Sequence, residues 1–528
     1  MASNSRLPLT LAAICGLLLL CTTTHSQTTH SQTVVLEQHQ FAHYIARFNA
    51  MEAETVVNAI PNAESLDWLA SQIPFFACPS KQLEEIYYYR WWSYRKHIKE
   101  TPDGWVLTEF LRPVSHAGAH NTIACALGHH LAEGRWLRSQ HILDDYIRFW
   151  FRAGEDHTPA RHFHKFSSWA AAAIYDRYLV TGDAKLLTEL LDDLIVDYRR
   201  WESERQAPDG LFWQYDVQDG MEESISGGRR VKNVRPTINS YMVANALAIA
   251  QIAKLSGRQE IAAEFGEKAV RLRAAMIERL WDEDNKFFKV RLEDGHLSDA
   301  REAIGFIPWT FDLAKAEHGA AWLQLKDDGG FKAPRGITTA ERRHPQFRSH
   351  GTGTCEWDGA VWPFATSQTL DGLANFIRGP QQSFVDRRDY FDNLLLYANA
   401  HQHAGKPYIG EYHDELTGAW LITGAKAERS RYYNHSTFAD LVIGGLIGIV
   451  PRDDAILELD PLLPGEAWDW FCLDGVPYHG HTLTIIWDRD GEHFRRGAGF
   501  SVWVDRKQLA SSPALDRLTV KLPEKQSE

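Results

Sequence analysis

The sequence contains few cysteines, and none of them is spaced as a metal-binding or redox pair. Its 528 residues include six of them, Cys15, Cys21, Cys78, Cys125, Cys355 and Cys472. No CxxC pair occurs, which argues against a zinc knuckle and a dithiol redox motif. The four that follow residue 26 are expected to be buried free thiols, because a chain of this length buries a large core without cross-links. One or two disulfides are the alternative.

The sequence also lacks a basic run and an excess of positive charge. Lys and Arg total 56 against 69 Asp and Glu, which gives a formal net charge of −13. Nucleic acids and anionic lipid surfaces are therefore poor candidates as partners. Hydrophobic residues make up 44% and charged residues 24% of the chain. These values exclude a disordered or collagen-like protein.

The long apolar run near the N-terminus is too short to span a membrane comfortably. Arg6 precedes the apolar run 7–21, and the small polar segment 22–26 follows it. A cationic start, an apolar core and a cleavage region of small polar residues, in this order, are typical of a secretory signal peptide. We therefore expect residues 1–26 to be removed. The mature protein should be soluble, without a membrane partner, and secreted or periplasmic.

Tryptophan is present in unusual number. There are 19 copies, and aromatic residues together make up 12% of the chain. Indole rings at this density suit a cleft that stacks flat apolar faces, sugar rings among them. Use of the tryptophans in the hydrophobic core is an equally weighted alternative.

The middle of the chain shows helical periodicity in pairs of segments joined by short turns. In the segment 185–201, Leu187, Leu190 and Leu194 recur at the three-four spacing of one helix face. Glycine ends the helix before it, at Gly182. The predicted pairs are 121–133 with 137–153, 167–181 with 185–201, 236–255 with 261–281, and 359–378 with 384–402.

The connections between the pairs are long and polar. They cover 154–166, 205–235, 282–308, 328–357 and 403–434. Helices in such an array alternate in direction, so the short turns fall at one end and the long loops at the other. This organisation predicts an all-α fold, an (α/α)6 toroid of about six hairpins, with an open α-solenoid as the alternative. Function is expected at the loop end, because loops on a rigid scaffold usually carry it.

After residue 450 the pattern changes from helical to β-type. The runs 483–487 and 500–504 read as short strands, and the turn cluster 488–491 follows the first of them. We expect a small C-terminal β-rich appendage. The predicted organisation is a signal peptide at 1–26, the helical toroid at 27–452, and the appendage at 453–528.

Two of the long loops hold carboxylates among aromatic residues and glycines. Asp219, Glu222 and Glu223 lie in the loop 205–235, and Glu411 lies in the loop 403–434. Two carboxyl groups that face each other across a cleft suffice for glycoside hydrolysis. One protonates the leaving oxygen, and the other activates water or attacks the anomeric carbon. Loop solvation and helix capping are the ordinary alternatives for such acids.

Three motifs in this order resemble those of six-hairpin glycosidases. They are Gly-Met-Glu-Glu-Ser at 220–224, Cys-Glu-Trp-Asp-Gly-Ala-Val-Trp-Pro at 355–363, and Gly-Glu-Tyr-His-Asp-Glu-Leu-Thr-Gly at 410–418. Over roughly residues 75–450 the chain is similar to the glycoside hydrolase family 63 type. That group includes mannosylglycerate and glucosylglycerate hydrolases, and family 37 trehalases are its relatives. The resemblance implies an inverting hydrolase with Glu222 as general acid and Glu411 as general base.

The sequence departs from the family pattern at three positions. Glu222 stands where the family has Asp, so Asp219 or Glu223 is an alternative acid. Asp358 stands where Arg is common, and Ala360 where Pro is. These differences leave the mechanism intact and the substrate open.

Further side chains near the motifs are candidates for contacting a sugar. Trp357 or Trp362 would form the floor of a subsite, and Arg235 or Asn239 would hydrogen-bond hydroxyl groups. Helix capping and core packing are the alternatives for these residues. The full set of expected substrate contacts is Trp213, Arg235, Asn239, Trp357, Asp358, Trp362 and Tyr412.

Two other functions stay open. A polysaccharide lyase or sugar epimerase on the same fold would use Tyr or His as base, with His120, His413, Tyr432 and Tyr433 as candidates. A carbohydrate-binding protein without catalysis would keep its ligand after loss of both acids. We expect a carbohydrate as partner, no cofactor and no metal, because the histidines show no convergent set of ligands in sequence. The oligomeric state stays open.

Overall fold

The computed structural model of the protein describes residues 35–524. The predicted signal peptide at 1–26 lies outside the described residues. Within them, the four predicted helix pairs are confirmed. The pairs are α4 (Leu127–Gly134) with α5 (His141–Arg152), α6 (Ala170–Thr181) with α7 (Lys185–Arg205), α8 (Pro236–Leu255) with α9 (Gln259–Leu280), and α11 (Pro363–Arg378) with α12 (Arg387–Ala400).

The first helix of each pair is inner and the second is outer, as their burial shows. α8 begins with Pro236 at its first turn and is buried on nearly all sides, which fits a helix surrounded by others. α9 buries a single stripe that includes Phe265, Leu272 and Met276 and leaves its other face polar. A one-sided stripe is the pattern of a helix that covers a core from outside.

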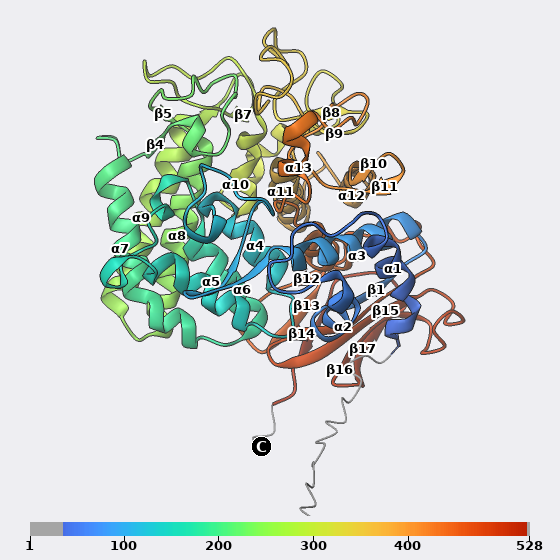
Figure 1. The fold of residues 1–528 in the computed structure, drawn as a ribbon. Coiled ribbons are helices and arrows are strands. Elements are labelled where there is room, and N and C mark those ends of the chain that lie inside the picture. The colour runs from blue at the N-terminus through green and yellow to red at the C-terminus, as the bar shows by residue number, and fades with distance from the viewer. Residues whose placement is uncertain (1–34, 525–528) are drawn as a thin grey trace, which may run out of the picture. The chain divides into compact units, whose positions relative to one another are not determined.

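The inner helices contact one another in a closed ring. α4 touches α6, α6 touches α8, and α8 touches α10 (Ile307–Thr310), which packs on α11. After α11 come α14 (Phe438–Asp440) and the π-helical segment η11 (Leu441–Ile447), and α14 returns to contact α4. The helices form a toroid rather than an open solenoid, because an open array would leave its first and last members apart (Figure 1).

The outer layer is less regular than the periodicity suggested. Opposite α10 lies a 3-10 segment, η9 (Ala316–Leu325), in place of a full helix. α3 (Lys81–Lys96) packs against α14 and α12, and it is covered by α1 (Ala42–Asn49) and α2 (Ser65–Gln72). None of the helices in the described part of the chain is long and apolar enough to cross a membrane.

The long loops contain short two-stranded hairpins, and β4, β5, β7, β8 and β9 of these hairpins lie at one end of the ring (Figure 1). Elsewhere, Gly182 ends α6 with a φ of 70° and packs against His479 in the turn between β14 and β15. A short helical segment, α13 (Ala427–Ser430), also lies in the loops. The paired strands are β2 (Ile98–Thr101) with β3 (Gly104–Leu107), β4 (Trp213–Gln214) with β5 (Asn233–Val234), β6 (Trp281–Asp282) with β7 (Phe287–Phe288), β8 (Lys332–Ala333) with β9 (Gly336–Ile337), and β10 (Gln402–His403) with β11 (Lys406–Pro407).

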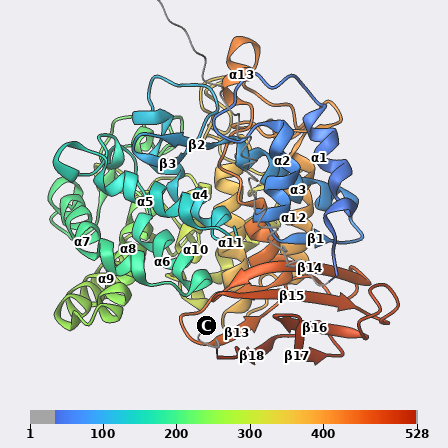
Figure 2. The ribbon, with the colours of Figure 1, turned by 60° about the horizontal axis from the view of Figure 1, so that its bottom comes forward.

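The C-terminal residues form two antiparallel sheets beside the helices (Figure 2). The five-stranded sheet has the order β1 (Phe75–Ala77), β14 (Trp470–Tyr478), β15 (His481–Asp488), β16 (Gly499–Val504) and β17 (Lys507–Ser512). The other contains β12 (Ile449–Val450), β13 (Ile456–Leu459) and β18 (Leu518–Lys521). The predicted strands at 483–487 and 500–504 are confirmed as parts of β15 and β16.

The all-α description holds for the toroid only, and the sheet is not confined to the C-terminus. Phe75 of β1 pairs with Asp474 of β14, so a strand that precedes the helices forms one edge of the sheet. A run of three residues carries no period that would mark it as a strand. The boundary at 452/453 stays a prediction.

Candidate active site

A cavity of about 390 Å³ opens among the long loops. Its wall draws on residues from the segments 109–125, 165–166, 215–230, 355–364 and 411–435, which are far apart in sequence. Glu222, Trp362 and Glu411 all line it. The loops that carry the three motifs therefore meet at one place. This is expected if the long loops all lie at the same end of the toroid.

Glu222 is held by a tight turn at the cavity wall. Gly220, two residues earlier, has a φ of 75°, a left-handed conformation that glycine adopts without strain. The Ile225 amide, just after Glu222, donates to Glu302 at 2.8 Å, which fixes the far side of the turn. Burial, reinforced by the charges of Glu411 and Glu109, raises the pKa of Glu222 to about 7. Its carboxyl group is therefore suited to stay protonated near neutral pH.

Glu411 has a different electrostatic environment in the same cavity. Its side chain is 4% exposed, and Arg429 donates to its Oε1 at 2.7 Å. The Ser430 hydroxyl accepts from the Glu411 amide at 2.8 Å, which fixes the backbone. Burial raises the pKa of Glu411, and the Arg429 guanidinium opposes that shift. The cation favours the ionised form of Glu411.

The two alternative acids beside Glu222 do not line the cavity. Asp219 is fully buried and accepts from Arg235 Nε at 2.7 Å and from the Ser167 hydroxyl at 2.5 Å. Glu223 pairs with Arg229. Of the three acids in this turn, Glu222 is the one whose carboxyl group reaches the cavity.

Asp219→Asn should destabilise the protein by up to about 3–5 kcal/mol, because it removes the direct ion-pair partner of the buried Arg235 and leaves only the more distant Asp216 and Glu302. The matched control is Glu223→Gln, which breaks the pair with the exposed Arg229 and should cost at most about 1 kcal/mol. Urea unfolding of both variants measures the difference. Equal losses would contradict the assignment of Asp219 to a structural ion pair.

Three aromatic rings form a stack behind the cavity wall. Trp362 lies between Trp357, at a centroid distance of 4.4 Å, and Tyr412, at 4.5 Å, with nearly parallel planes. All three rings are buried, and of the three only Trp362 lines the cavity. The Tyr412 hydroxyl accepts from the Cys355 amide at 3.0 Å and so holds the middle motif. Trp357 and Tyr412 therefore cover the two faces of the Trp362 ring and hold it in place.

The remaining predicted contacts lie away from the cavity lining. Asn239 bonds the backbone of Phe212 at 2.8 Å in both directions, so it ties the loop to α8. Asp358 accepts from the amide of His350 at 2.9 Å, and Trp213 lies beneath Arg205. Arg235 is occupied by Asp219. The polar groups of these residues are engaged with other parts of the protein and stabilise the loops.

Several cavity residues were not predicted from the sequence. Glu109, Cys125 and His435 line it together with Tyr433 and Arg429, and they come from three separate segments. The sequence offers Tyr433 only as a candidate lyase base, and it offers no role for His435. No local spacing links Glu109 or Cys125 to the motifs.

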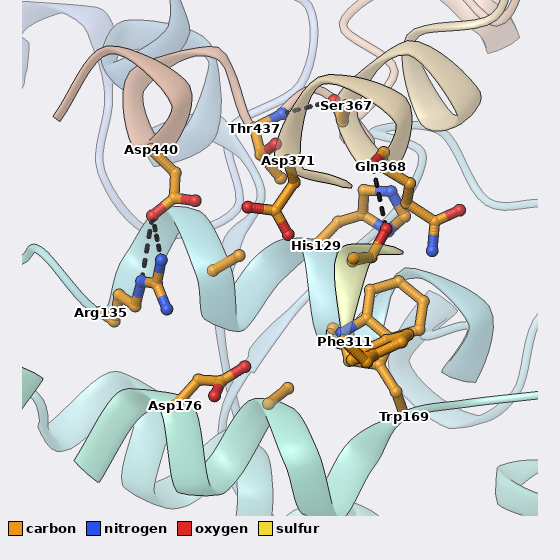
Figure 3. A pocket seen from close by; sticks show the side chains of 14 residues that line it. His129, Arg135, Trp169, Asp176, Phe311, Ser367, Gln368, Asp371, Thr437 and Asp440 are labelled. Carbon is orange, nitrogen blue, oxygen red and sulfur yellow. Dashed lines mark hydrogen bonds and ion pairs between the residues drawn. The ribbon is translucent and has the colours of Figure 1, made fainter. Parts of the chain in front are cut away.

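A second and much smaller cavity, of about 50 Å³, lies between the inner helices (Figure 3). Asp176, Asp371 and Asp440 approach it, and Arg135 pairs with Asp440 at 2.8 Å. Burial raises the pKa of Asp371 to about 8. Ligand sites usually enclose roughly 300–1,000 Å³, so this space is too small for a sugar.

A ring of helical hairpins with a carboxylate-lined cavity among its loops has the architecture of the six-hairpin glycosidases. The chain belongs to the family of mannosylglycerate hydrolase MGH1-like glycoside hydrolases, whose domain model matches residues 119–436. A model for the C-terminal domain of glycosyl hydrolase family 65 matches residues 451–510. The predicted relationship to glycosidases of this type is confirmed.

Solved structures add a likeness over most of the chain. One described as a sialidase is 49% identical, with a TM-score of 0.91, and the match covers 93% of this chain and 45% of that one. The chain thus spans less than half of that protein, whose name describes the whole of it. A family 78 rhamnosidase of Bacillus sp. GL1 is 12% identical over 79% of this chain and 40% of its own, with a TM-score of 0.58. That likeness is one of fold.

A third solved structure is a family 63 mannosylglycerate hydrolase from Thermus thermophilus in complex with glucose. It is 16% identical, with a TM-score of 0.48, and the match covers 64% of this chain and 95% of that one.

Proposed function

We propose that the protein is an exported glycoside hydrolase that cleaves an O-glycosidic bond with inversion. Glu222 is the general acid and Glu411 the general base. One observation carries the proposal: both carboxyl groups line one cavity, and only one of them has a cationic partner. Arg429 pairs with Glu411, whereas no cation of the described residues forms an ion pair with Glu222. Two acids held in unlike environments can take opposite roles in one reaction.

The chemistry follows from these environments. The protonated Glu222 would donate its proton to the oxygen of the leaving group as the glycosidic bond breaks. The ionised Glu411 would take a proton from water, which attacks the anomeric carbon from the opposite face. An inverting pair leaves room for that water, with carboxyl groups roughly 6.5–9.5 Å apart.

The cavity favours a small glycoside or the end of an oligosaccharide as substrate. A space of about 390 Å³ accommodates one or two sugar units rather than a long chain. Lys165, Arg229 and Arg230 also line it, and the two arginines are exposed. These cations support a substrate that carries a negatively charged group outside the reacting sugar. Export by the signal peptide at 1–26 is part of the proposal.

The test is a panel of aryl and natural glycosides, matched in pairs with and without a carboxylate, followed by ¹H NMR of the first product. Release of the inverted anomer supports the proposal, and release of the retained anomer contradicts inversion. An unsaturated product would instead indicate a lyase. Binding without turnover across the panel would indicate a carbohydrate-binding protein.

Trp362→Leu should raise KM by about two- to tenfold, because aromatic contact of this kind contributes roughly 0.5–1.5 kcal/mol. The matched variant Trp357→Leu removes the neighbouring ring of the stack, which does not line the cavity. Trp357→Leu should lower Tm about as much as Trp362→Leu does, but it should change KM less. If both variants change KM equally, Trp362 acts through packing and not through contact with the sugar.

A further inference from the structure

Three side chains with metal-binding atoms converge in the cavity wall. Cys125 Sγ lies 3.8 Å from Glu109 Oε2, and His435 Nε2 lies 3.1 Å from Glu109 Oε1. All three ligand atoms are within 4.8 Å of one another. The residues are 4%, 6% and 1% exposed for Glu109, Cys125 and His435, yet all three line the cavity and are reached from it.

The surrounding structure fixes the three positions. Arg90 donates to the Ser436 carbonyl at 2.8 Å, and the Asn434 amide donates to the Glu109 carbonyl at 3.1 Å. The two hydrogen bonds tie the segment around His435 both to α3 and to the segment that carries Glu109. The imidazole ring packs in parallel on His129 at a centroid distance of 5.3 Å. The cluster is therefore held in place by its neighbours.

The hydrogen bonding of the cluster is incomplete. Nδ1 of the buried His435 makes no hydrogen bond to the described residues, and Nε2 has a 3.1 Å contact with Glu109 that lacks hydrogen-bond geometry. Buried polar atoms are usually paired, so an orphan of this kind needs an explanation. An imidazole nitrogen with a free lone pair beside a thiol and a carboxyl group matches the set of ligands that zinc prefers.

The distances agree with a tetrahedral centre. Zinc bonds of about 2.3 Å to sulfur and about 2.0–2.1 Å to nitrogen or oxygen place ligand atoms about 3.3–3.6 Å apart. Two of the three separations, 3.8 and 3.1 Å, lie within a few tenths of an ångström of that range, and the third, between Cys125 and His435, is within 4.8 Å. We propose that Glu109, Cys125 and His435 form a site for a thiophilic divalent cation, Zn²⁺ above all, in the wall of the cavity. Its fourth position would face the cavity, open to water or a substrate hydroxyl.

The charges suit a buried dication. A thiolate and a carboxylate together balance two positive charges, so the loaded site is neutral. Burial raises the pKa of Glu109 to about 7 and lowers that of His435, and it raises the pKa of the Cys125 thiol. A metal binds the deprotonated forms of both groups, so binding releases any protons that they carry. His116, Arg429, Glu222 and Glu411 also interact electrostatically with Glu109, and Arg90 does so with His435.

The test is titration of the chelator-treated protein with Co²⁺, which reports thiolate ligation as a charge-transfer absorption band. We expect one Co²⁺ per chain with this band, and its loss on addition of Zn²⁺, which binds such sites more tightly. Cys125→Ser should abolish the band. Cys355→Ser, which removes the other thiol that lines the cavity, should retain it.

His435→Asn and Glu109→Gln provide independent checks, with circular dichroism to establish that each variant folds. Each should weaken Co²⁺ binding by more than about 100-fold, since even loss of a partner outside the ligand sphere costs 10–100-fold. A wild-type protein without the band overturns the proposal, and so does a band that survives in Cys125→Ser. The cobalt titration does not depend on glycosidase activity. A negative titration would therefore contradict the metal site without contradicting the proposed reaction.

Discussion

Glu411→Gln is expected to lower kcat by about 10²–10⁴-fold on every substrate, the range that general base catalysis usually contributes. An amide cannot take a proton from water, so the attacking nucleophile stays unactivated whatever the leaving group is. The loss should therefore be as large on an activated aryl glycoside as on a natural glycoside. Steady-state kinetics on both substrates measure it.

Two controls separate loss of the base from damage to the cavity. Added azide, which needs no activation, should restore product formation in Glu411→Gln. Arg429→Gln keeps the carboxyl group but removes its cation, so the pKa of Glu411 should rise. Because the base works only when ionised, the acidic limb of the pH profile should then move to higher pH. Undiminished activity of Glu411→Gln on both substrates would remove it from the mechanism.

Glu222→Gln is expected to lose most activity on substrates with poor leaving groups and much less on an activated aryl glycoside. A poor leaving group needs the proton of the acid, whereas an activated aryl group departs without it. For natural substrates the expected loss is about 10²–10⁴-fold in kcat. The measurement is the ratio of kcat on the two substrate types, compared with the wild-type ratio.

The pH profile gives a second and independent measure of Glu222. Its pKa of about 7 means that the carboxyl group is protonated below that pH and ionised above it. Activity on natural substrates should thus fall as pH rises through about 7, and this limb should be absent for Glu222→Gln. Because the charges of Glu222 and Glu411 influence each other, the apparent pKa values of the two limbs describe the pair rather than either residue alone. Small and equal losses in both variants would leave neither carboxyl group catalytic.

The periodic parts of the fold were predictable, because burial repeats along a helix. The buried stripe of α9 is visible in the sequence, and so is the glycine turn after α6. The 3-10 segment η9 and the strand β1 were not predictable from local periodicity, since their form depends on what packs against them. In such segments tertiary contacts override local preference.

The site was predictable where an acid and its motif are contiguous, as at Glu222 and Glu411. Polar residues beside these motifs were harder to interpret, because a loop needs its own hydrogen bonds. Asn239 looked suited to a sugar, yet it satisfies the backbone of Phe212. Glu109 and His435 are 326 residues apart, and only the closure of the ring brings them together.

The contact that closes the ring also governs when the protein can fold. α14 meets α4, and β14 meets β1, although nearly 400 residues separate the two strands. Pairings of such long sequence separation form slowly, because closing the loop costs conformational entropy before the stabilising contacts have formed. The first helices emerge from the ribosome without the segments that complete their packing. The chain reaches its final core only after its last quarter has been made, so a nascent or truncated form exposes apolar helix faces and an unpaired strand edge to aggregation.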